Sequence, residues 1–387
     1  MQTITPFPFV SVTGGAFERG RQYGKQAAER IRKSADMYGR TLENLGYSRA
    51  SRDALILSFA KSIGEFGAHY LDEMHGIAEG SGVPFADIVM INARTEVLAK
   101  ARAENVSAVD EEGGDGCTGA LILPERSATG RLIHGQNWDW RADCVETGIV
   151  LRVHNDDGPD FLTFVEAGGL ARSGLNSVGV SITANYLESS RDFESLGVPL
   201  SLLRRSALEQ SVFANALKIV ATTPKSCSNN VMLGMAEGFG IDIECAPDEH
   251  FPIYPGDDQL IVHANHWVSP VARSKLVDTG CENSPDSHYR DWRVRKLLNQ
   301  SELIGRQELK QALFDSFGTP FAVCRPPRPG TRHSTTATVA MVVMEPALGE
   351  MDVAPLPALN RTFTRYSLTA EPVRLDDQDS NHPAGSA

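Results

Sequence analysis

The strongest candidate for a reactive residue in this chain is Cys117. It directly follows Gly116 at the end of an acidic, glycine-rich run over residues 110–116. Glycine before the sulfur leaves the preceding carbonyl unshielded, so a thiolate at Cys117 could attack its own peptide bond. If that bond broke, Cys117 would carry a thiol and a free α-amine, and one residue would supply both nucleophile and base. The alternative is a buried cysteine that begins a core strand, because free cysteine is among the most buried residue types.

A terminal α-amine suits the role of base. Its unperturbed pKa of about 7.7–8.0 leaves much of it neutral near pH 7, whereas a lysine with a pKa of about 10.4 would be mostly charged. The ten histidines include none whose spacing marks it as the partner of a cysteine. A cysteine enzyme without such a partner needs another base, and the new amine would provide it.

Acyl transfer also needs hydrogen-bond donors aimed at the developing oxyanion. Two asparagines stand in turn-like contexts, Asn176 in Gly-Leu-Asn-Ser-Val-Gly and Asn265 in His-Ala-Asn-His. Each has the alternative of being a turn residue, since asparagine favours turns. Asp139 could orient a terminal ammonium by charge attraction; its alternative is a solvated acid at the end of a strand.

Signatures of other chemistries are absent from the sequence. The serine-hydrolase Gly-x-Ser-x-Gly, the phosphate-binding Gly-x-x-x-x-Gly-Lys-Ser/Thr and the zinc motif His-Glu-x-x-His do not occur. His263 and His266 lie three residues apart, but a zinc site needs at least three protein ligands and no third stands out. We therefore favour a structural or substrate-lining role for this pair, and we expect no metal and no cofactor.

Composition narrows the class of protein. The chain has 387 residues, 41% of them hydrophobic and 22% charged, with a net charge of -12, so it is globular and a poor match for nucleic acid or an anionic membrane surface. The first residues do not resemble a secretory signal, and no apolar run is long enough to span a membrane. Six scattered cysteines favour neither a disulfide framework nor a zinc site. The expected location is the cytoplasm.

The sequence pattern changes from helical to strand-like at Cys117. Residues 15 to about 105 read as helical, residues 103–116 as an exposed linker suited to cleavage, and residues 369–387 as a frayed tail. The order of helices, strands, helices and strands favours an α+β fold of stacked layers over a doubly wound sheet. The predicted strands are 118–123, 131–138, 148–154, 161–166, 175–183, 229–235, 239–245, 259–263 and 335–345, and the predicted helices are 18–38, 52–80, a third from Pro84, then 199–210, 212–222, 287–299 and 306–317.

A set of short motifs, weak singly but specific in this order, gives the chain a family resemblance. It resembles the autoproteolytic cysteine N-terminal-nucleophile (Ntn) hydrolases, and within them the family of acyl-coenzyme A:6-aminopenicillanic acid acyltransferases (isopenicillin N acyltransferases, peptidase family C45). The match covers most of the chain. Its motifs are Gly20-Arg21-Gln22-Tyr23-Gly24, residues 73–80, Asn92 with Glu96, Asp115-Gly116-Cys117-Thr118, residues 135–139, Asn176, Asn265-His266 and Ser287-His288-Tyr289-Arg290.

The resemblance implies a four-layer αββα fold and self-cleavage between Gly116 and Cys117. Residues 1–116 would form a helical small subunit and residues 117–387 the catalytic large subunit, which stay together as a heterodimer. Cys117 would be the nucleophile and its own amine the base, with Asp139 steadying that amine. Asn265 and the region around Asn176 would stabilise the oxyanion. Arg290 would be a charge near the sulfur; its alternative is a solvated residue on a basic helix.

One departure from the relatives bears on function. The bile-salt hydrolase and penicillin V acylase branch typically has arginine where this chain has Gln136, and it lacks the long helical pro-segment, so the chain is closer to the acyltransferase branch. We expect an amidohydrolase or N-acyltransferase acting on a small N-acylated compound, with hydrolysis favoured because the chain is acidic. The alternatives are a coenzyme A-dependent acyltransferase, a binding protein that lost the chemistry, and a papain-like cysteine hydrolase.

Overall fold

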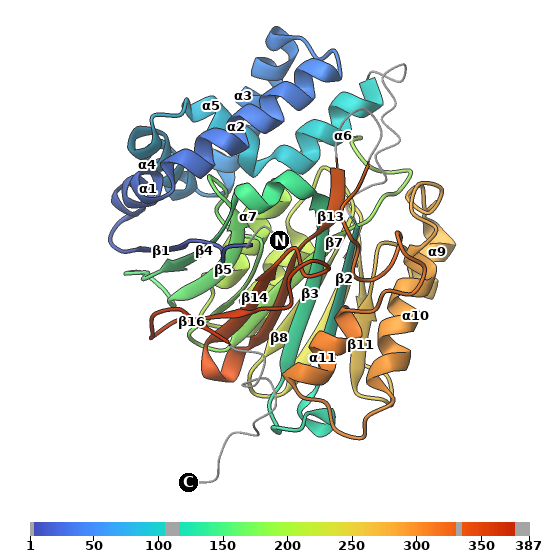
Figure 1. Ribbon diagram of the computed structural model, residues 1–387. Coiled ribbons are helices and arrows are strands. Elements are labelled where there is room, and N and C mark those ends of the chain that lie inside the picture. The colour runs from blue at the N-terminus through green and yellow to red at the C-terminus, as the bar shows by residue number, and fades with distance from the viewer. Residues whose placement is uncertain (1–3, 105–115, 330–334, 376–387) are drawn as a thin grey trace.

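Two β-sheets packed face to face form the centre of the molecule (Figure 1). The computed structural model describes residues 4–104, 116–329 and 335–375. Sheet A has the strand order β1-β4-β5-β6-β7-β8-β9-β10, and sheet B the order β11-β2-β3-β13-β14-β15-β16, with β12 paired to β13. The strands of sheet A are β1 (Phe9–Val12), β4 (Gly148–Val153), β5 (Phe161–Glu166), β6 (Ser173–Asn176), β7 (Val180–Tyr186), β8 (Asn229–Met235), β9 (Phe239–Cys245) and β10 (His250–Ile253). Those of sheet B are β11 (Leu260–His263), β2 (Gly116–Ile122), β3 (Ile133–Arg141), β13 (Thr335–Glu345), β14 (Glu350–Pro355), β15 (Thr364–Ser367), β16 (Val373–Arg374) and β12 (Arg328–Pro329).

Helices cover the outer face of each sheet, because each sheet has a second apolar face to bury. α7 (Leu200–Leu208) and α8 (Phe213–Thr222) pack on sheet A, and α10 (Ser287–Leu298) and α11 (Arg306–Leu313) pack on sheet B. The short α9 (Pro270–Lys275) lies between β11 and α10 in the chain. The predicted four-layer αββα architecture is therefore confirmed.

The segment before Cys117 is helical, as expected, but in more pieces than the periodicity suggests. The expected helix at 52–80 is broken at Gly67, whose extended backbone separates two helices. α1 and α4 then pack so closely that a Cβ on Gly20 or Gly76 would lie 2.1 Å from a carbonyl oxygen of the other helix. The helices are α1 (Ala16–Gln26), α2 (Ala28–Asn44), α3 (Arg49–Phe66), α4 (Ala68–Ser81), α5 (Phe85–Asn92) and α6 (Arg94–Glu104).

Most predicted strands of the catalytic segment are confirmed, with three corrections. The single strand expected at 175–183 is two strands, β6 and β7, because a turn at Gly179 with φ of +90° interrupts it. Part of the tail expected from residue 369 is ordered, since β16 pairs with β15. The short strands β10, β12, β14, β15 and β16 were not predicted, nor was β1 in the N-terminal segment. Residues 105–115 of the expected linker and 376–387 of the expected tail lie outside the described residues.

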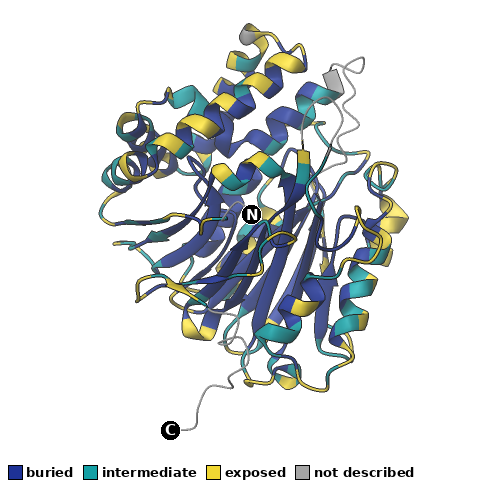
Figure 2. Ribbon diagram, viewed as in Figure 1, coloured by how far each residue is buried: buried dark blue, intermediate teal, exposed yellow. Residues whose placement is uncertain are grey.

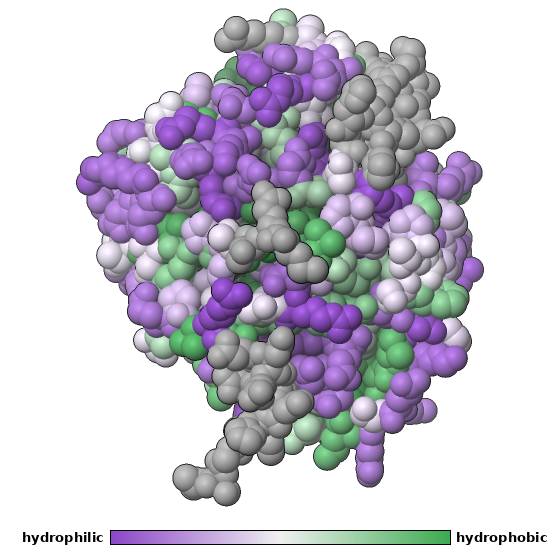
Figure 3. All heavy atoms as spheres, in the orientation of Figure 1, coloured by the Kyte–Doolittle hydropathy of each residue, from purple (hydrophilic) through white to green (hydrophobic). Residues whose placement is uncertain are grey.

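The strands are almost wholly buried, while exposed positions gather on the outward sides of the helices (Figure 2). The outer surface of the N-terminal helices is mostly hydrophilic (Figure 3), so their apolar side chains, such as Ile31, Phe59, Met74 and Ile77, face the interior. In the part of the chain that the structure describes, no helix has the length and apolar character needed to cross a bilayer.

Candidate active site

Pairing of β2 with β3 brings the candidate nucleophile and the candidate acid to one place. Gly116 lies opposite Asp139, and Cys117 lies opposite Trp138. Because side chains alternate across a strand, Cys117 packs in the core between the two sheets, while Thr118 reaches Arg290 of α10 on the outer side. The Gly116–Cys117 bond thus lies at the start of a fully buried strand.

Three polar groups contact Cys117, which has no solvent exposure. Its backbone N–H donates to Asn265 Oδ1 at 2.8 Å, and its carbonyl oxygen accepts from Arg290 Nη1 at 2.7 Å. On the inner side, Arg172 Nη2 lies 3.6 Å from Cys117 Sγ. A guanidinium beside a sulfur favours the thiolate, which is the nucleophilic form.

Asn265 and Arg290 reach Cys117 as a pair. Asn265 follows β11, and its Oδ1 accepts from Arg290 Nη2 at 2.9 Å as well as from the Cys117 N–H. Its Nδ2 donates to the carbonyl of Tyr186 at 2.9 Å. Arg290 has no solvent exposure, so its alternative as a solvated residue is wrong. Burial and the neighbouring Arg325 lower the pKa of Arg290.

Asp139 is buried on the outer side of sheet B and is not a solvated acid. Its Oδ2 pairs with Arg325 Nε at 3.1 Å, and its Oδ1 accepts from Thr338 Oγ1 at 2.6 Å. Arg325 also pairs with Asp286, which in turn pairs with Arg290 at 2.7 Å. Burial raises the pKa of Asp139, against the opposing charges of Arg325 and Arg290.

Asn176 is not brought to this site by any contact in the structure. It lies at the end of β6, where its Nδ2 donates to the carbonyls of Leu208 and Gln210 at 2.9 and 3.1 Å. Its Oδ1 accepts from the N–H groups of Val178 and Val180. Both of its amide hydrogens have acceptors among the described residues, so this side chain closes a turn, and the oxyanion role expected of the region around Asn176 stays a prediction.

Sequence reasoning missed Asn185, a polar residue at the end of β7. Its Oδ1 accepts from Gln136 Nε2 at 2.7 Å, and its Nδ2 donates to the carbonyl of His263 at 3.1 Å. Gln136 also accepts from Ser173 Oγ at 2.7 Å. The sequence offers only a weak signal for Asn185, which is the second-last residue of a predominantly buried strand.

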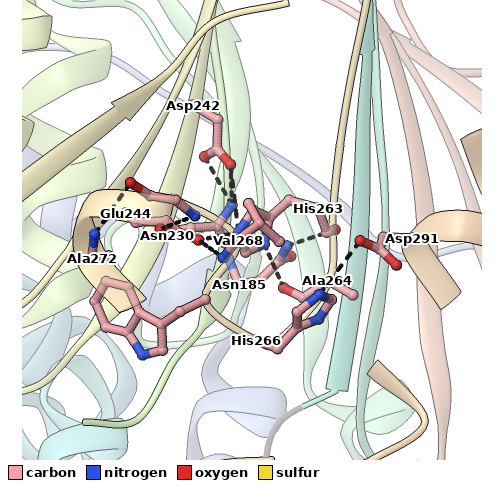
Figure 4. A network of polar contacts seen from close by, with 12 residues as sticks. Asn185, Asn230, Asp242, Glu244, His263, Ala264, His266, Val268, Ala272 and Asp291 are labelled. Atoms are coloured by element: carbon pink, nitrogen blue, oxygen red, sulfur yellow. Dashed lines mark hydrogen bonds and ion pairs between the residues drawn. The ribbon is translucent and has the colours of Figure 1, made fainter. Parts of the chain in front are cut away.

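A buried network of Asp242, Glu244 and His263 lies beside Asn185 (Figure 4). His263 Nε2 lies 2.8 Å from Glu244 Oε1 and 3.9 Å from Asp242 Oδ2. Asn230 links Asp242 to the backbone N–H of Asn185. Burial lowers the pKa of His263, but the two carboxylates outweigh it and raise that pKa to about 9. The structural role favoured for His263 fits this arrangement.

His266, the second imidazole of the pair, faces the other way. Its Nδ1 lies 2.7 Å from Ser287 Oγ and its Nε2 3.6 Å from Asp291 (Figure 4). Burial lowers its pKa to about 3. Over residues 4–104, 116–329 and 335–375, no group of three or more histidine, cysteine, aspartate or glutamate side chains is arranged to hold a metal ion.

A small cavity of about 30 Å³ lies between the N-terminal helices and sheet A, and Cys117 itself does not line it. Arg172, the residue that contacts the sulfur, lines it together with Arg94, Arg204, Glu96 and Glu166. Arg172 and Arg94 also lie over the rings of Trp138 and Trp140 at 4.2 and 4.8 Å from the ring centroids. Residues from both segments therefore line this cavity.

Comparison with known proteins found curated proteins that are similar in sequence to this chain. The chain is 28% identical over 341 residues to the 40 kDa form of acyl-coenzyme A:6-aminopenicillanic-acid-acyltransferase of Emericella nidulans, covering 84% of this chain and 87% of that protein. It is 28% identical over 240 residues to an N-acylethanolamine-hydrolyzing acid amidase of Caenorhabditis elegans, covering 56% of this chain and 59% of the amidase. No family model matches the chain.

Solved structures of similar proteins were also found. A conjugated bile acid hydrolase of Clostridium perfringens has a TM-score of 0.45 at 12% identity and covers 68% of this chain and 97% of its own. The C. elegans N-acylethanolamine-hydrolyzing acid amidase ortholog has a TM-score of 0.43 at 16% identity, with coverage of 60% and 94%. By its sequence similarity, this chain is a relative of the acyl-coenzyme A:6-aminopenicillanic acid acyltransferases, as its motifs predict.

Proposed function

We propose that this protein is an N-terminal-cysteine amidohydrolase or N-acyltransferase that first cleaves itself between Gly116 and Cys117. The observation that carries the proposal is the set of contacts on Cys117: Asn265 accepts from its N–H, Arg290 donates to its carbonyl and Arg172 lies beside its sulfur. Any buried strand residue needs partners for its backbone N–H and carbonyl, but a merely structural cysteine does not need a guanidinium beside its sulfur. The similarity to an acyltransferase and to an amidase supports the same class of chemistry.

Maturation proceeds in two balanced steps. The Cys117 sulfur attacks the carbonyl carbon of Gly116, the C–N bond breaks, and the thiol proton passes to the departing nitrogen. The product is a thioester between Gly116 and Cys117, with a free α-amine on Cys117. Water then hydrolyses the thioester, which gives a Gly116 carboxylate and restores the thiol.

Turnover uses the same groups on a substrate amide. The α-amine takes the thiol proton, the sulfur attacks the substrate carbonyl, and the amine half leaves with that proton. The side-chain amides of Asn265 and Asn185 donate hydrogen bonds to the oxyanion and stabilise it. The Asp139 carboxylate stabilises the ammonium form of the base by charge attraction. Water attack on the acyl-thioester gives hydrolysis, and attack by a bound amine gives transfer.

We propose hydrolysis of a small N-acylated compound as the main reaction. The net charge of -12 does not favour the phosphates of coenzyme A. The second candidate is coenzyme A-dependent transfer, which the similarity to the E. nidulans acyltransferase favours. We further propose that the two fragments remain a heterodimer, because α1–α6 bury their apolar side chains against the catalytic segment. All six cysteines are free, which fits a reducing cytoplasm.

Mass spectrometry of the large fragment tests the proposal. The protein is mixed with N-acylethanolamines, N-acyl amino acids and acyl-coenzyme A thioesters, and the fragment is measured intact and after digestion. We expect an added acyl mass on Cys117 with at least one donor, and loss of the adduct in Cys117→Ala. The matched control is Cys227→Ala, which removes another fully buried thiol and should leave labelling unchanged. Labelling that survives in Cys117→Ala would rule out Cys117 as the acyl carrier.

A further inference from the structure

Arg325 lies between α11 and β13 and is buried, although the chemistry described so far assigns it no task. Its backbone is fixed to β13, since its N–H donates to Thr338 Oγ1 at 2.7 Å and its carbonyl accepts from the Thr338 N–H at 3.0 Å. Its guanidinium pairs with Asp139 on one side and Asp286 on the other. A guanidinium held at both ends has one defined position.

That position is against Gly116. A Cβ on residue 116 would lie 2.7 Å from Arg325 Nη1 and 2.9 Å from Cζ, which is closer than a carbon atom can approach. A side chain at position 116 would therefore force the guanidinium to shift away from its two aspartate partners. Arg325 therefore packs on the residue whose carbonyl is attacked in the proposed self-cleavage.

The same guanidinium belongs to a continuous series of charged contacts that ends on Cys117. Asp139 pairs with Arg325, Arg325 with Asp286, Asp286 with Arg290, and Arg290 donates to the Cys117 carbonyl. We call these four charged residues the junction cluster. It contains two arginines and two aspartates, so each carboxylate lies against one or two guanidinium groups.

We propose that Arg325 is a positioning residue for self-cleavage, holding Asp139 beside the Gly116–Cys117 bond and, through Asp286, setting Arg290 against the Cys117 carbonyl. The inference rests on the proposed cleavage at this bond. In the uncleaved chain Arg325 is the cation that pairs with Asp139. After cleavage the new ammonium of Cys117 joins it on the same carboxylate, so the acid is already in place when the amine forms.

The charge of Arg325 matters as well as its shape. Burial raises the pKa of Asp139, and among the charges around that carboxylate Arg325 opposes the shift most, followed by Arg290. The other ionisable groups that face it are Asp286, Arg328 and the thiol of Cys324. Without Arg325, Asp139 would hold its proton to higher pH, and the acid limb of cleavage would move upward.

The test follows cleavage of the full chain made by cell-free translation, with precursor and fragments measured by intact mass over a pH series. We expect Arg325→Gln to slow cleavage by about ten- to hundredfold, the usual effect of losing a charge-assisted contact, and to move the acid limb upward. Arg325→Lys keeps the charge and should restore the wild-type pH profile with a smaller loss of rate. Gly116→Ala should block cleavage because its methyl group meets the guanidinium.

The control is Arg293→Gln. Arg293 lies one turn after Arg290 on α10 and pairs with Asp315, so this variant should cleave at the wild-type rate. If Arg325→Gln fails to fold, Asp286→Asn takes its place and should slow cleavage by severing Arg325 from Arg290. Wild-type rate and pH profile in the folded variant would overturn the inference alone. A wild-type chain that never splits would overturn the proposed function, and the inference with it.

Discussion

Two buried ion clusters in this molecule look alike in composition but differ in what they touch. The junction cluster lies beside Cys117. The second cluster, which we call the clamp, consists of Arg19, Glu73, Arg205 and Glu209 and joins the N-terminal helices to α7. Glu73 accepts from Arg19 and Arg205 at 2.7 Å each, and Arg205 binds Glu209 at the same distance.

The two clusters differ in the groups that they contact and in the direction in which the pKa of a carboxylate is shifted. The clamp contacts Tyr70, His69, Asn155 and the carbonyl of Leu170, whereas the junction cluster donates a hydrogen bond to the backbone carbonyl of Cys117, the proposed nucleophile. Burial opposes ionisation of Glu209, but Arg205 and other partners outweigh it and lower its pKa to about 2. In Asp139 burial wins and the pKa is raised. A buried ion cluster marks a site only when it also contacts a reactive group.

The largest expected effect separates the clamp from the site. Glu73→Gln removes the carboxylate shared by two buried guanidinium groups, and breaking a buried pair typically costs about 3–5 kcal/mol. We expect a large fall in the free energy of unfolding, measured by denaturant titration, with turnover per folded molecule unchanged. Glu79→Gln on the exposed side of the same helix is the control. Lost turnover in folded Glu73→Gln protein would show that the clamp takes part in the chemistry.

The next effect concerns the two asparagines. If Asn265 supplies an oxyanion donor, Asn265→Ala should lower kcat by about 10²–10³ with little change in KM. Asn176→Ala should leave kcat near the wild-type value and lower stability instead, because its amide only closes a turn. Steady-state kinetics on matured protein distinguish the two. A change confined to KM in Asn265→Ala would contradict the oxyanion role.

The smallest effect is the order in which turnover and stability are lost as the pH falls. Glu209 has a lowered pKa, so its contribution to stability is complete above the ordinary value of 4.5 and is lost as the pH falls through about 2. Asp139 has a raised pKa, so its carboxylate is lost at a higher pH than an ordinary aspartate. Turnover should therefore fall before the clamp weakens. The check is to measure melting curves and turnover rates at the same series of pH values. Unfolding at a higher pH than the loss of turnover would contradict the prediction.

Much of the fold follows from the sequence because it depends on local pattern. Alternation and turn residues give the strands at 229–235, 239–245 and 335–345 with the bounds that the structure has. Four of the proposed site residues, Cys117, Asp139, Asn265 and Arg290, are brought together as the motifs suggest. Their catalytic roles stay predictions.

What the sequence could not supply are long-range contacts. Arg325 stands in an unremarkable Cys-Arg-Pro-Pro stretch, and only the pairing of β13 with β3 brings it to Asp139. Arg172 reaches the sulfur from the opposite sheet, which no spacing in the chain encodes. The structure places Asn176 in a turn, which the sequence could not settle, because a turn asparagine and an oxyanion asparagine have the same sequence context.

The most direct test of the central claim is terminal sequencing of freshly purified protein together with its intact mass. The account predicts two associated fragments, the larger of which begins with Cys117 and has 271 residues, 387 less 116. Cys117→Ala should stay a single inactive chain. An active wild-type enzyme that is one uncut polypeptide of 387 residues would contradict the account.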